Sequence, residues 1–374
     1  MPVGLVVMKW DPRIGTKIVT QYPEEIKISD STLMQIYSTH EYSGEAGMIS
    51  LMVGPLNIAS YFTGPDQGYY LILLLTLDDD PDAFEGGLSD ISRIIIQNLD
   101  DDGFIPMIPS LFRRLSVYPN LNQEQLLAIT YQDEVKRMII NRLRDEGVVS
   151  KSELNIWLKD EYRYGFFDID AVLFDLVKRE IIKVASVKDM PSELIFLIKD
   201  LLILRIPPTK LLKNPVEKGL PETLVADYKI TVRKYFQNYH PSEEDALALI
   251  NLIVNPAVYD TLKLLRTTIA TRNLLEKLKK KGVDDVDAVL KELWEHKLIN
   301  VFRDKRGIEY YTMLSDFYMS LTYPKYLLNT VINEYEVKSK SDKVLVEYLN
   351  VLEDAYYNMK SKKKPSTKEV EAEE

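Results

Sequence analysis

The chain has 374 residues, of which 46% are hydrophobic and 28% are charged, and its formal net charge is −10. This length predicts two or three domains, and the apolar content argues against general disorder. The acidic balance disfavours a protein whose whole surface binds nucleic acid or an anionic membrane. The absence of cysteine excludes disulfides, thiolate nucleophiles and thiolate metal ligands.

Residues 1–7 contain no basic leader, so we expect no signal peptide. The longest apolar run, residues 69–77, is shorter than the roughly 20 residues that a membrane-spanning helix needs. From these two features we expect a cytoplasmic protein.

The N-terminal third has the pattern of a small sheet with helices. Alternating apolar residues predict five strands, at residues 4–10, 16–22, 48–53, 56–63 and 69–77. A helix beginning near Asp30, with His40 on its apolar face, follows the second strand. Another helix, with Leu88 and Ile95 on its buried face, follows the fifth strand. The expected order is strand, strand, helix, three strands, helix.

This order of elements, together with the local sequence at residues 57–61 (Asn-Ile-Ala-Ser-Tyr), resembles the longin domain and its profilin-like relatives over residues 1–115. The resemblance implies a five-stranded antiparallel sheet covered by helices. A roadblock domain has a similar sheet but normally places a helix ahead of the first strand, so it is the second choice. We expect the three prolines at 106, 109 and 119 to form a connector.

An internal repeat follows the connector. Residues 168–184 and 285–301 match at one constant offset in two Asp, Ala, Val and two Leu residues, and then in Ile and Val. Helices are predicted before each copy, at residues 133–146 and after the capping box at 150–153 for the first, and at 256–265 and 271–280 for the second. A hairpin is predicted after each copy. Three helices followed by a hairpin resemble a winged helix.

These patterns predict an α+β chain with a longin-like sheet, two winged-helix domains and C-terminal helices. The expected parts are a longin-like domain at 1–115, a first winged helix at 125–206, a Pro-rich connector at 207–243, a second winged helix at 244–316, helices at 317–360 and a disordered charged tail at 361–374. The apolar stripe of the last helix contains Val344, Leu345, Tyr348, Leu352 and Tyr356.

Few residues could support catalysis. The three histidines are His40, expected to be half-buried and satisfied, His240 in a loop, and His296, which aligns with Arg179 in the repeat and suggests a tolerant surface position. The acidic runs 78–80 and 100–102 lack the spacing of a calcium loop and are expected at solvated turns. No zinc-binding or phosphate-loop motif occurs. We therefore expect no enzyme activity, no metal and no cofactor.

A winged helix commonly places its third helix in the DNA major groove. Here the start of that helix is acidic in both copies, with Asp168, Asp170 and Asp175 in the first and Asp284, Asp285 and Asp287 in the second, which disfavours this docking mode. The second copy also carries basic residues that could contact a phosphate backbone: Lys277, Lys279, Lys280, Lys281, Arg303, Lys305 and Arg306. A solvated helix end is the simpler explanation for the lysines.

The combined resemblance indicates a non-catalytic adaptor or scaffold. Longin domains resemble parts of trafficking adaptors and small-GTPase regulators, and tandem winged helices resemble subunits of the membrane-remodelling ESCRT-II complex. The expected partners are proteins, with a small GTPase or other assembly subunits as the first choice. The alternative is a winged-helix regulator that binds nucleic acid. The sequence leaves the oligomeric state open.

Overall fold

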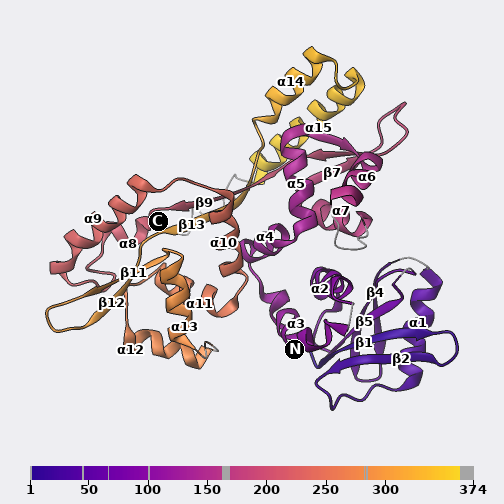
Figure 1. The fold of residues 1–374 in the computed structure, drawn as a ribbon, viewed down its shortest axis with the longest axis horizontal. Coiled ribbons are helices and arrows are strands. Elements are labelled where there is room, and N and C mark those ends of the chain that lie inside the picture. Colours follow the sequence, from indigo (N-terminus) through magenta and orange to yellow (C-terminus); the bar gives the residue numbers. More distant parts are fainter. Residues whose placement is uncertain are drawn as a thin grey trace, which may run out of the picture. The chain divides into compact units, whose positions relative to one another are not determined.

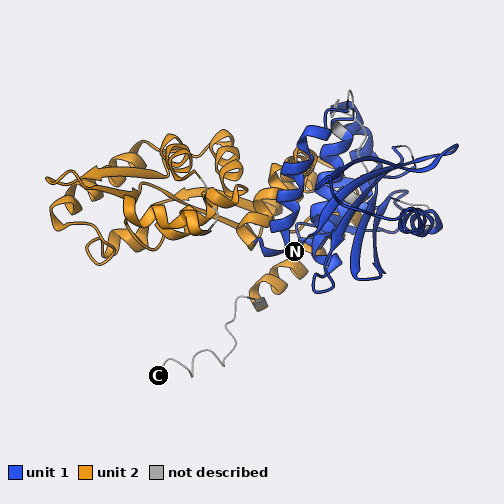
Figure 2. Cartoon of the chain, turned by 90° about the horizontal axis from the view of Figure 1, so that it is seen from below, with its two compact units in different colours: residues 1–121, 148–196 blue, residues 122–147, 197–374 orange. Residues whose placement is uncertain are grey.

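The computed structural model describes residues 2–43, 46–65, 67–99, 102–161, 169–281, 283 and 285–362. The chain divides into a first unit, residues 1–121 with 148–196, and a second unit, residues 122–147 with 197–374 (Figure 2). The expected charged tail lies outside the described residues from residue 363 onward.

Five antiparallel strands form the sheet of the first unit (Figure 1). They are β1 (Gly4–Asp11), β2 (Gly15–Tyr22), β3 (Gly47–Val53), β4 (Leu56–Phe62) and β5 (Tyr69–Leu75), in the spatial order β2-β1-β5-β4-β3. The predicted five-stranded antiparallel sheet is confirmed. Because β1 and β5 are central, they are paired on both edges; residues 4–8 of β1 and 70–75 of β5 are buried.

Helices cover both faces of this sheet. Successive residues of a strand point to opposite faces, so Val6 and Met8 pack with α1 (Asp30–Ser43), whereas Leu5 and Val7 pack with α2 (Glu85–Gln97) and α3 (Ile108–Val117). Short 3-10 helices precede or follow α2 and α3, at Pro81–Phe84, Ile105–Met107 and Tyr118–Asn120.

The expected proline connector after α2 was wrong, because α3 fills that interval. Pro106 and Pro109 stand in the first turn of a 3-10 helix and of α3. Proline is tolerated there because those positions have no intrahelical partner for an N–H group.

The two repeat copies have the same order of elements. The first contains β6 (Val148–Ser150), α6 (Lys151–Glu161), α7 (Ile169–Lys178), β7 (Ile182–Ala185) and β8 (Leu194–Leu197). The second contains β10 (Ala270–Thr271), α12 (Arg272–Leu275) with the 3-10 helix η5 (Glu276–Lys281), α13 (Val286–Glu295), β11 (Ile299–Arg303) and β12 (Glu309–Met313). The sheet orders also correspond, as β6-β8-β7 and β10-β12-β11.

The correspondence extends to single residues after α7 and α13. Glu180 and Lys297, which are equivalent in the repeat, both have a left-handed backbone with φ of 58°. In each copy the next amide donates back to the helix, from Ile181 N to Leu176 O at 3.0 Å and from Leu298 N to Leu293 O at 2.9 Å. Both helices therefore end in the same kind of C-cap.

One helix precedes each copy and one strand follows it. The helices are α5 (Glu134–Glu146) and α11 (Pro256–Leu265), and the strands are β9 (Asp200–Ile206) and β13 (Asp316–Thr322). In the second unit β9 and β13 pair with each other as an antiparallel two-stranded sheet. No local pattern in the sequence indicates this pairing.

The remaining helices belong to the second unit: α4 (Gln123–Gln132), α8 (Thr209–Lys213), α9 (Glu222–Asn238), α10 (Glu243–Ile253), α14 (Leu327–Val337) and α15 (Asp342–Lys362). The interval 207–243, expected to be a connector, therefore contains two helices. The predicted C-terminal helices are confirmed, and four of the five stripe residues on α15 are buried, whereas Tyr356 is exposed.

Among the described residues, no single helix is long and apolar enough to cross a membrane. The pair α10 and α11, bent by 99°, passes the same test of length and composition together. Both helices contribute buried leucine, isoleucine and valine residues to the core of the second unit.

Candidate functional site

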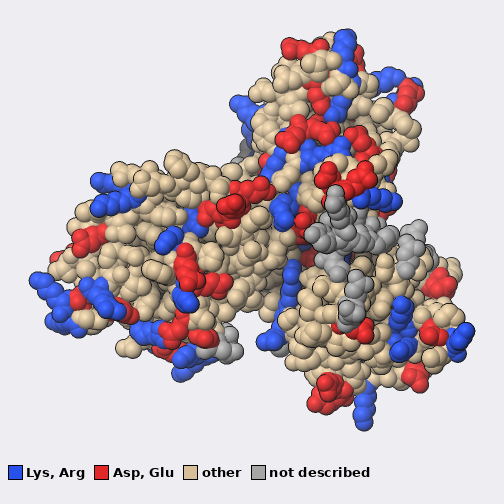
Figure 3. Space-filling view, in the orientation of Figure 1, with Lys and Arg blue, Asp and Glu red and all other residues tan. Residues whose placement is uncertain are grey.

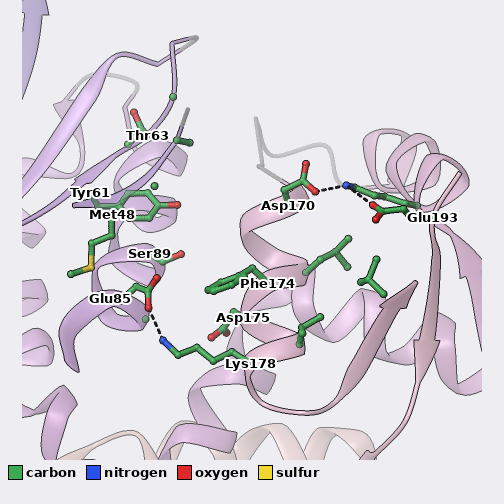
Figure 4. Close-up of a pocket in the computed structure, with 18 of the residues that line it drawn as sticks. Met48, Tyr61, Thr63, Glu85, Ser89, Asp170, Phe174, Asp175, Lys178 and Glu193 are labelled. Carbon is green, nitrogen blue, oxygen red and sulfur yellow. Dashed lines mark hydrogen bonds and ion pairs between the residues drawn. The ribbon is translucent and has the colours of Figure 1, made fainter. Parts of the chain in front are cut away.

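A cavity of about 750 Å³ lies within the first unit, between the N-terminal sheet domain and α7 (Figure 4). One wall consists of Met48 and Tyr61 from β3 and β4 and Ser89 from α2. The other wall is α7, with Phe174 projecting into the space. Both walls belong to the first unit.

The wall formed by α7 carries apolar side chains that remain exposed. Phe174 is 59% exposed and Val177 is 40% exposed. On the opposite side of α7, Val172 and Leu176 are completely buried. The helix therefore carries two apolar faces, and only one of them is used by the core.

Ion pairs border the cavity (Figure 4). The Lys178 ammonium lies 2.6 Å from a Glu85 carboxylate oxygen. The Lys151 ammonium lies 2.5 Å from Asp170 and 3.3 Å from Glu193. The hydrogen bond to Asp170, with support from Glu193, raises the pKa of the Lys151 side chain. Both lysines are therefore engaged by neighbouring carboxylates.

Arg179 anchors the C-terminal end of α7. Its Nε donates to both oxygens of Asp175 at 3.2 Å, and its Nη2 donates to the Tyr118 hydroxyl at 3.1 Å. Burial raises the pKa of Tyr118, so this hydroxyl stays neutral. The inference that this repeat position is a tolerant surface site was wrong for Arg179, because the side chain is buried in this network.

Most of the acidic residues in or beside α7 and α13 form ion pairs or cap the helix. In the first copy Asp175 is buried against Arg179, and Asp170 binds Lys151. In the second copy Asp287 binds Arg272, and Asp285 caps α13 by accepting from Ala288 N at 2.9 Å. Asp168 and Asp284 lie outside the described residues.

The structure places the basic candidates of the second copy at two separate sites (Figure 1). Lys277, Lys279 and Lys280 are exposed on η5, where Lys279 binds Glu276 at 2.6 Å; the Lys281 side chain lies outside the described set. Arg303 binds Glu309 at 2.6 Å, and Lys305 and Arg306 are exposed at the tip of the β11–β12 hairpin. Figure 3 shows basic side chains at this tip beside acidic ones.

His40 and His296 make contacts within the fold. His40 is fully buried rather than half-buried, and its Nε2 lies 3.0 Å from the Ser60 hydroxyl. Burial lowers the pKa of His40 to about 4. The Nδ1 of His296 lies 2.9 Å from the Glu292 carbonyl oxygen.

His240 and His296 line a second hollow, of about 670 Å³, in the second unit. The hollow also contains Arg205, whose Nε donates to Asp245 at 2.8 Å. Asp245 accepts from the Tyr239 hydroxyl at 2.9 Å, and burial together with this bond raises the pKa of Tyr239 to about 12. Within this hollow, Asp245 therefore neutralises the charge of Arg205.

Within the acidic run 78–80, Asp79 and Asp80 accept hydrogen bonds that stabilise local turns. Asp79 accepts from the Thr76 amide at 3.1 Å and from its hydroxyl at 2.7 Å, and Asp80 accepts from the Asp82 amide. Asp100 and Asp101 lie outside the described residues. Within the described part of the chain, no group of three or more His, Asp or Glu residues is arranged to hold a metal ion.

Sequence reasoning did not identify the cavity residues Phe174 and Val177. A signal was present, because the repeat helix at 168–176 has apolar residues on both faces. No model of a known protein family matches the chain, and no curated protein matches it.

Proposed function

We propose that the chain is a non-catalytic cytoplasmic adaptor or scaffold that binds a protein partner at the cavity wall formed by α7. The observation that carries this proposal is the exposure of Phe174 and Val177 opposite Met48 and Tyr61. Exposed apolar side chains in a concave site are typical of surfaces that bind partners. The lysines at the border are engaged by carboxylates, which favours binding over proton transfer.

The N-terminal domain supports the same proposal through its resemblance to longin domains. Its five-stranded antiparallel sheet with helices on both faces agrees with the helix-covered sheet that the resemblance implies. Longin domains resemble parts of vesicle-trafficking adaptors and small-GTPase regulators. We infer from this a partner that is a small GTPase or another subunit of a trafficking assembly.

The two repeat copies support tandem winged helices. Each has a helix, a short strand, two further helical segments and a hairpin, and the short strand pairs with the second hairpin strand. Tandem winged helices resemble the protein-binding subunits of ESCRT-II. We assign this arrangement to protein–protein contacts within one assembly, made in the first copy through α7.

The proposal is tested with Phe174→Glu in the full chain. Trp294→Glu is a matched control, because Trp294 is an exposed apolar residue on α13, the helix equivalent to α7. Cross-linking and mass spectrometry in native lysate should recover partners with the unmodified chain and with W294E, and at least tenfold less with F174E. The proposal would be contradicted if the unmodified chain were recovered only as a free monomer, or if partners were recovered equally with F174E and W294E.

A nucleic-acid-binding regulator is the second candidate. It is favoured by one observation, the engagement of Asp287 by Arg272, which lowers the repulsion that the acidic start of α13 would exert on phosphates. Lys305 and Arg306 are exposed on the hairpin of the same repeat copy. Duplex DNA should then bind with an affinity that falls steeply with salt, and K305E/R306E should lower the salt slope by about two. The control is Lys188→Glu, an exposed lysine near the turn of the first hairpin. Salt-independent or absent binding would exclude this function.

A further inference from the structure

The last helix, α15, has a second apolar stripe on a largely exposed face. Within it, the Tyr356 ring contacts the ring of Tyr323. One face is buried through Val344, Tyr348 and Leu352. A different face exposes Val346 (57%), Leu349 (43%), Tyr356 (45%) and Tyr357 (59%). Along this face, positions 346, 349, 353, 356 and 360 alternate steps of three and four residues, as in the seam of a coiled coil.

The charges on the exposed stripe have opposite signs at its two ends. Asp342 lies in the first turn of α15, Glu353 lies near the middle of the stripe, and Lys360 lies near its end. The Lys360 ammonium lies 5.9 Å from the centre of the Tyr356 ring, so these two residues share a face. A stripe that begins acidic and ends basic is complementary to itself when two copies run antiparallel.

We propose that the exposed stripe of α15 pairs with α15 of a second copy of this chain in an antiparallel arrangement. With the midpoint near residue 351, Val346 lies opposite Tyr356 of the second copy and Asp342 lies opposite its Lys360. In the antiparallel arrangement, the positive N-terminal end of each helix also lies beside the negative C-terminal end of the other helix. The helix has 21 residues and is about 31 Å long, so it presents nearly six turns to the partner.

An anionic membrane fits this face less well than a second copy does. Helices that lie on membranes carry lysine or arginine on their polar face. By contrast, α15 carries four acidic residues against three lysines, and Glu353 stands within the stripe itself. Vesicle binding is therefore an outcome that would count against the proposal.

Sedimentation velocity of the full chain over a range of concentrations tests the pairing. The unmodified chain should shift from monomer to dimer, and Leu349→Glu should raise the dimer dissociation constant at least tenfold. The control Asn358→Glu adds the same charge to an exposed α15 position outside the stripe and should leave the constant unchanged. A chain that stays monomeric at all concentrations, or equal effects of L349E and N358E, would overturn the proposal.

Charge reversal tests the antiparallel register and does not depend on an apolar substitution. D342K and K360E should each weaken the dimer, and the double variant should restore it, because the introduced lysine of one chain then faces the introduced glutamate of the other. In a pelleting assay with vesicles that contain phosphatidylserine, the unmodified chain should stay in the supernatant. Lack of rescue in the double variant, or pelleting that K360E abolishes, would refute the second copy as the occupant.

Engineered cysteines give an independent readout, because the chain contains none of its own. A mixture of Val346→Cys and Tyr356→Cys chains should form a mixed disulfide under mild oxidation. Either variant alone should not, since equivalent residues would lie about 15 Å apart along the helix pair, too far for a disulfide. Equal cross-linking in all three samples would contradict the register.

Discussion

Ile203 of β9 and Met319 of β13 are register partners at the centres of two strands of seven residues each. The first residue of each strand, Asp200 or Asp316, pairs with the last residue of the other. The two strands occupy the same place after the two repeat copies. An approximate two-fold axis therefore passes between Ile203 and Met319 and relates β9 to β13.

Two arginines obey the same symmetry. Arg144 donates from Nε to Asp200 at 2.8 Å, and Arg266 donates from Nε to Asp316 at 2.9 Å. Each also donates from Nη2 to the carbonyl oxygen of the next strand residue, at 2.9 Å and 3.5 Å. The duplication therefore includes the contacts that hold the start of each strand.

We predict that Asp200→Asn lowers the free energy of unfolding by about 1–3 kcal/mol, because it leaves the half-buried Arg144 without its carboxylate partner. Asp316→Asn should cost less, because Arg266 keeps an ion pair with Glu124 at 2.8 Å. Urea denaturation measures both. The control is Glu309→Gln, which removes the partner of the exposed Arg303 and should cost less than about 0.5 kcal/mol. A larger effect at Asp316 than at Asp200 would show that Glu124 does not compensate for the lost carboxylate.

Local pattern was sufficient to predict the first sheet. Its strands alternate apolar residues between glycine and proline turns. Three of its pairs, β1–β2, β3–β4 and β4–β5, join neighbours in sequence, whereas the β1–β5 pair joins the two ends of the strand series. The β9–β13 pair was not predictable in this way. Five of the seven residues at 200–206 are apolar, and nothing in them indicates a partner more than a hundred residues away. Long-range pairing depends on the folded position of both repeat copies.

The cavity wall was only partly predictable, for a related reason. The sequence of α7 shows that the helix is apolar on two faces, but not which face the core covers. The core takes Val172 and Leu176, and Phe174 is left exposed. The second helix of the expected connector, α9, was missed because its aromatic and β-branched residues, such as Tyr228 and Val232, have weak helix propensity. Both residues are buried, so tertiary packing decides the conformation.

Replacement of Gly147 by alanine is expected to lower the free energy of unfolding. Its φ is 71°, and an added Cβ would lie 2.6 Å from the ring of Tyr348. Gly147→Ala should therefore cost about 2–4 kcal/mol, from left-handed strain and overpacking together. Gly307 has a similar φ of 79° with nothing near its missing Cβ, so Gly307→Ala should cost only about 1–2 kcal/mol. Equal melting temperatures for the two variants would show that the Tyr348 contact has no energetic effect.

The equivalent positions Arg179 and His296 should respond differently to alanine. Arg179→Ala leaves the buried Asp175 carboxylate without its ion pair and should cost about 2–4 kcal/mol. His296→Ala removes one bond to a carbonyl oxygen and should cost about 1 kcal/mol or less. Urea midpoints of the two variants give the comparison. If Arg179→Ala lowers the free energy of unfolding by less than His296→Ala does, the network with Tyr118 does not stabilise the first unit.

Stability of the first unit should fall when the pH falls from about 6.5 towards 4, because of His40. Its pKa is about 4 in the folded chain, where the ring is buried beside Ser60, against 6.5 as the ordinary value. The unfolded chain therefore binds a proton in this range that the folded chain does not, so unfolding is favoured as the pH decreases. The loss is on the order of 2–3 kcal/mol at pH 4. Because carboxylates also titrate there, the measurement is the difference in pH dependence between the unmodified chain and His40→Gln, whose amide can still bond Ser60. His40→Gln should have the flatter profile, and parallel profiles would show that His40 does not lower stability at acidic pH.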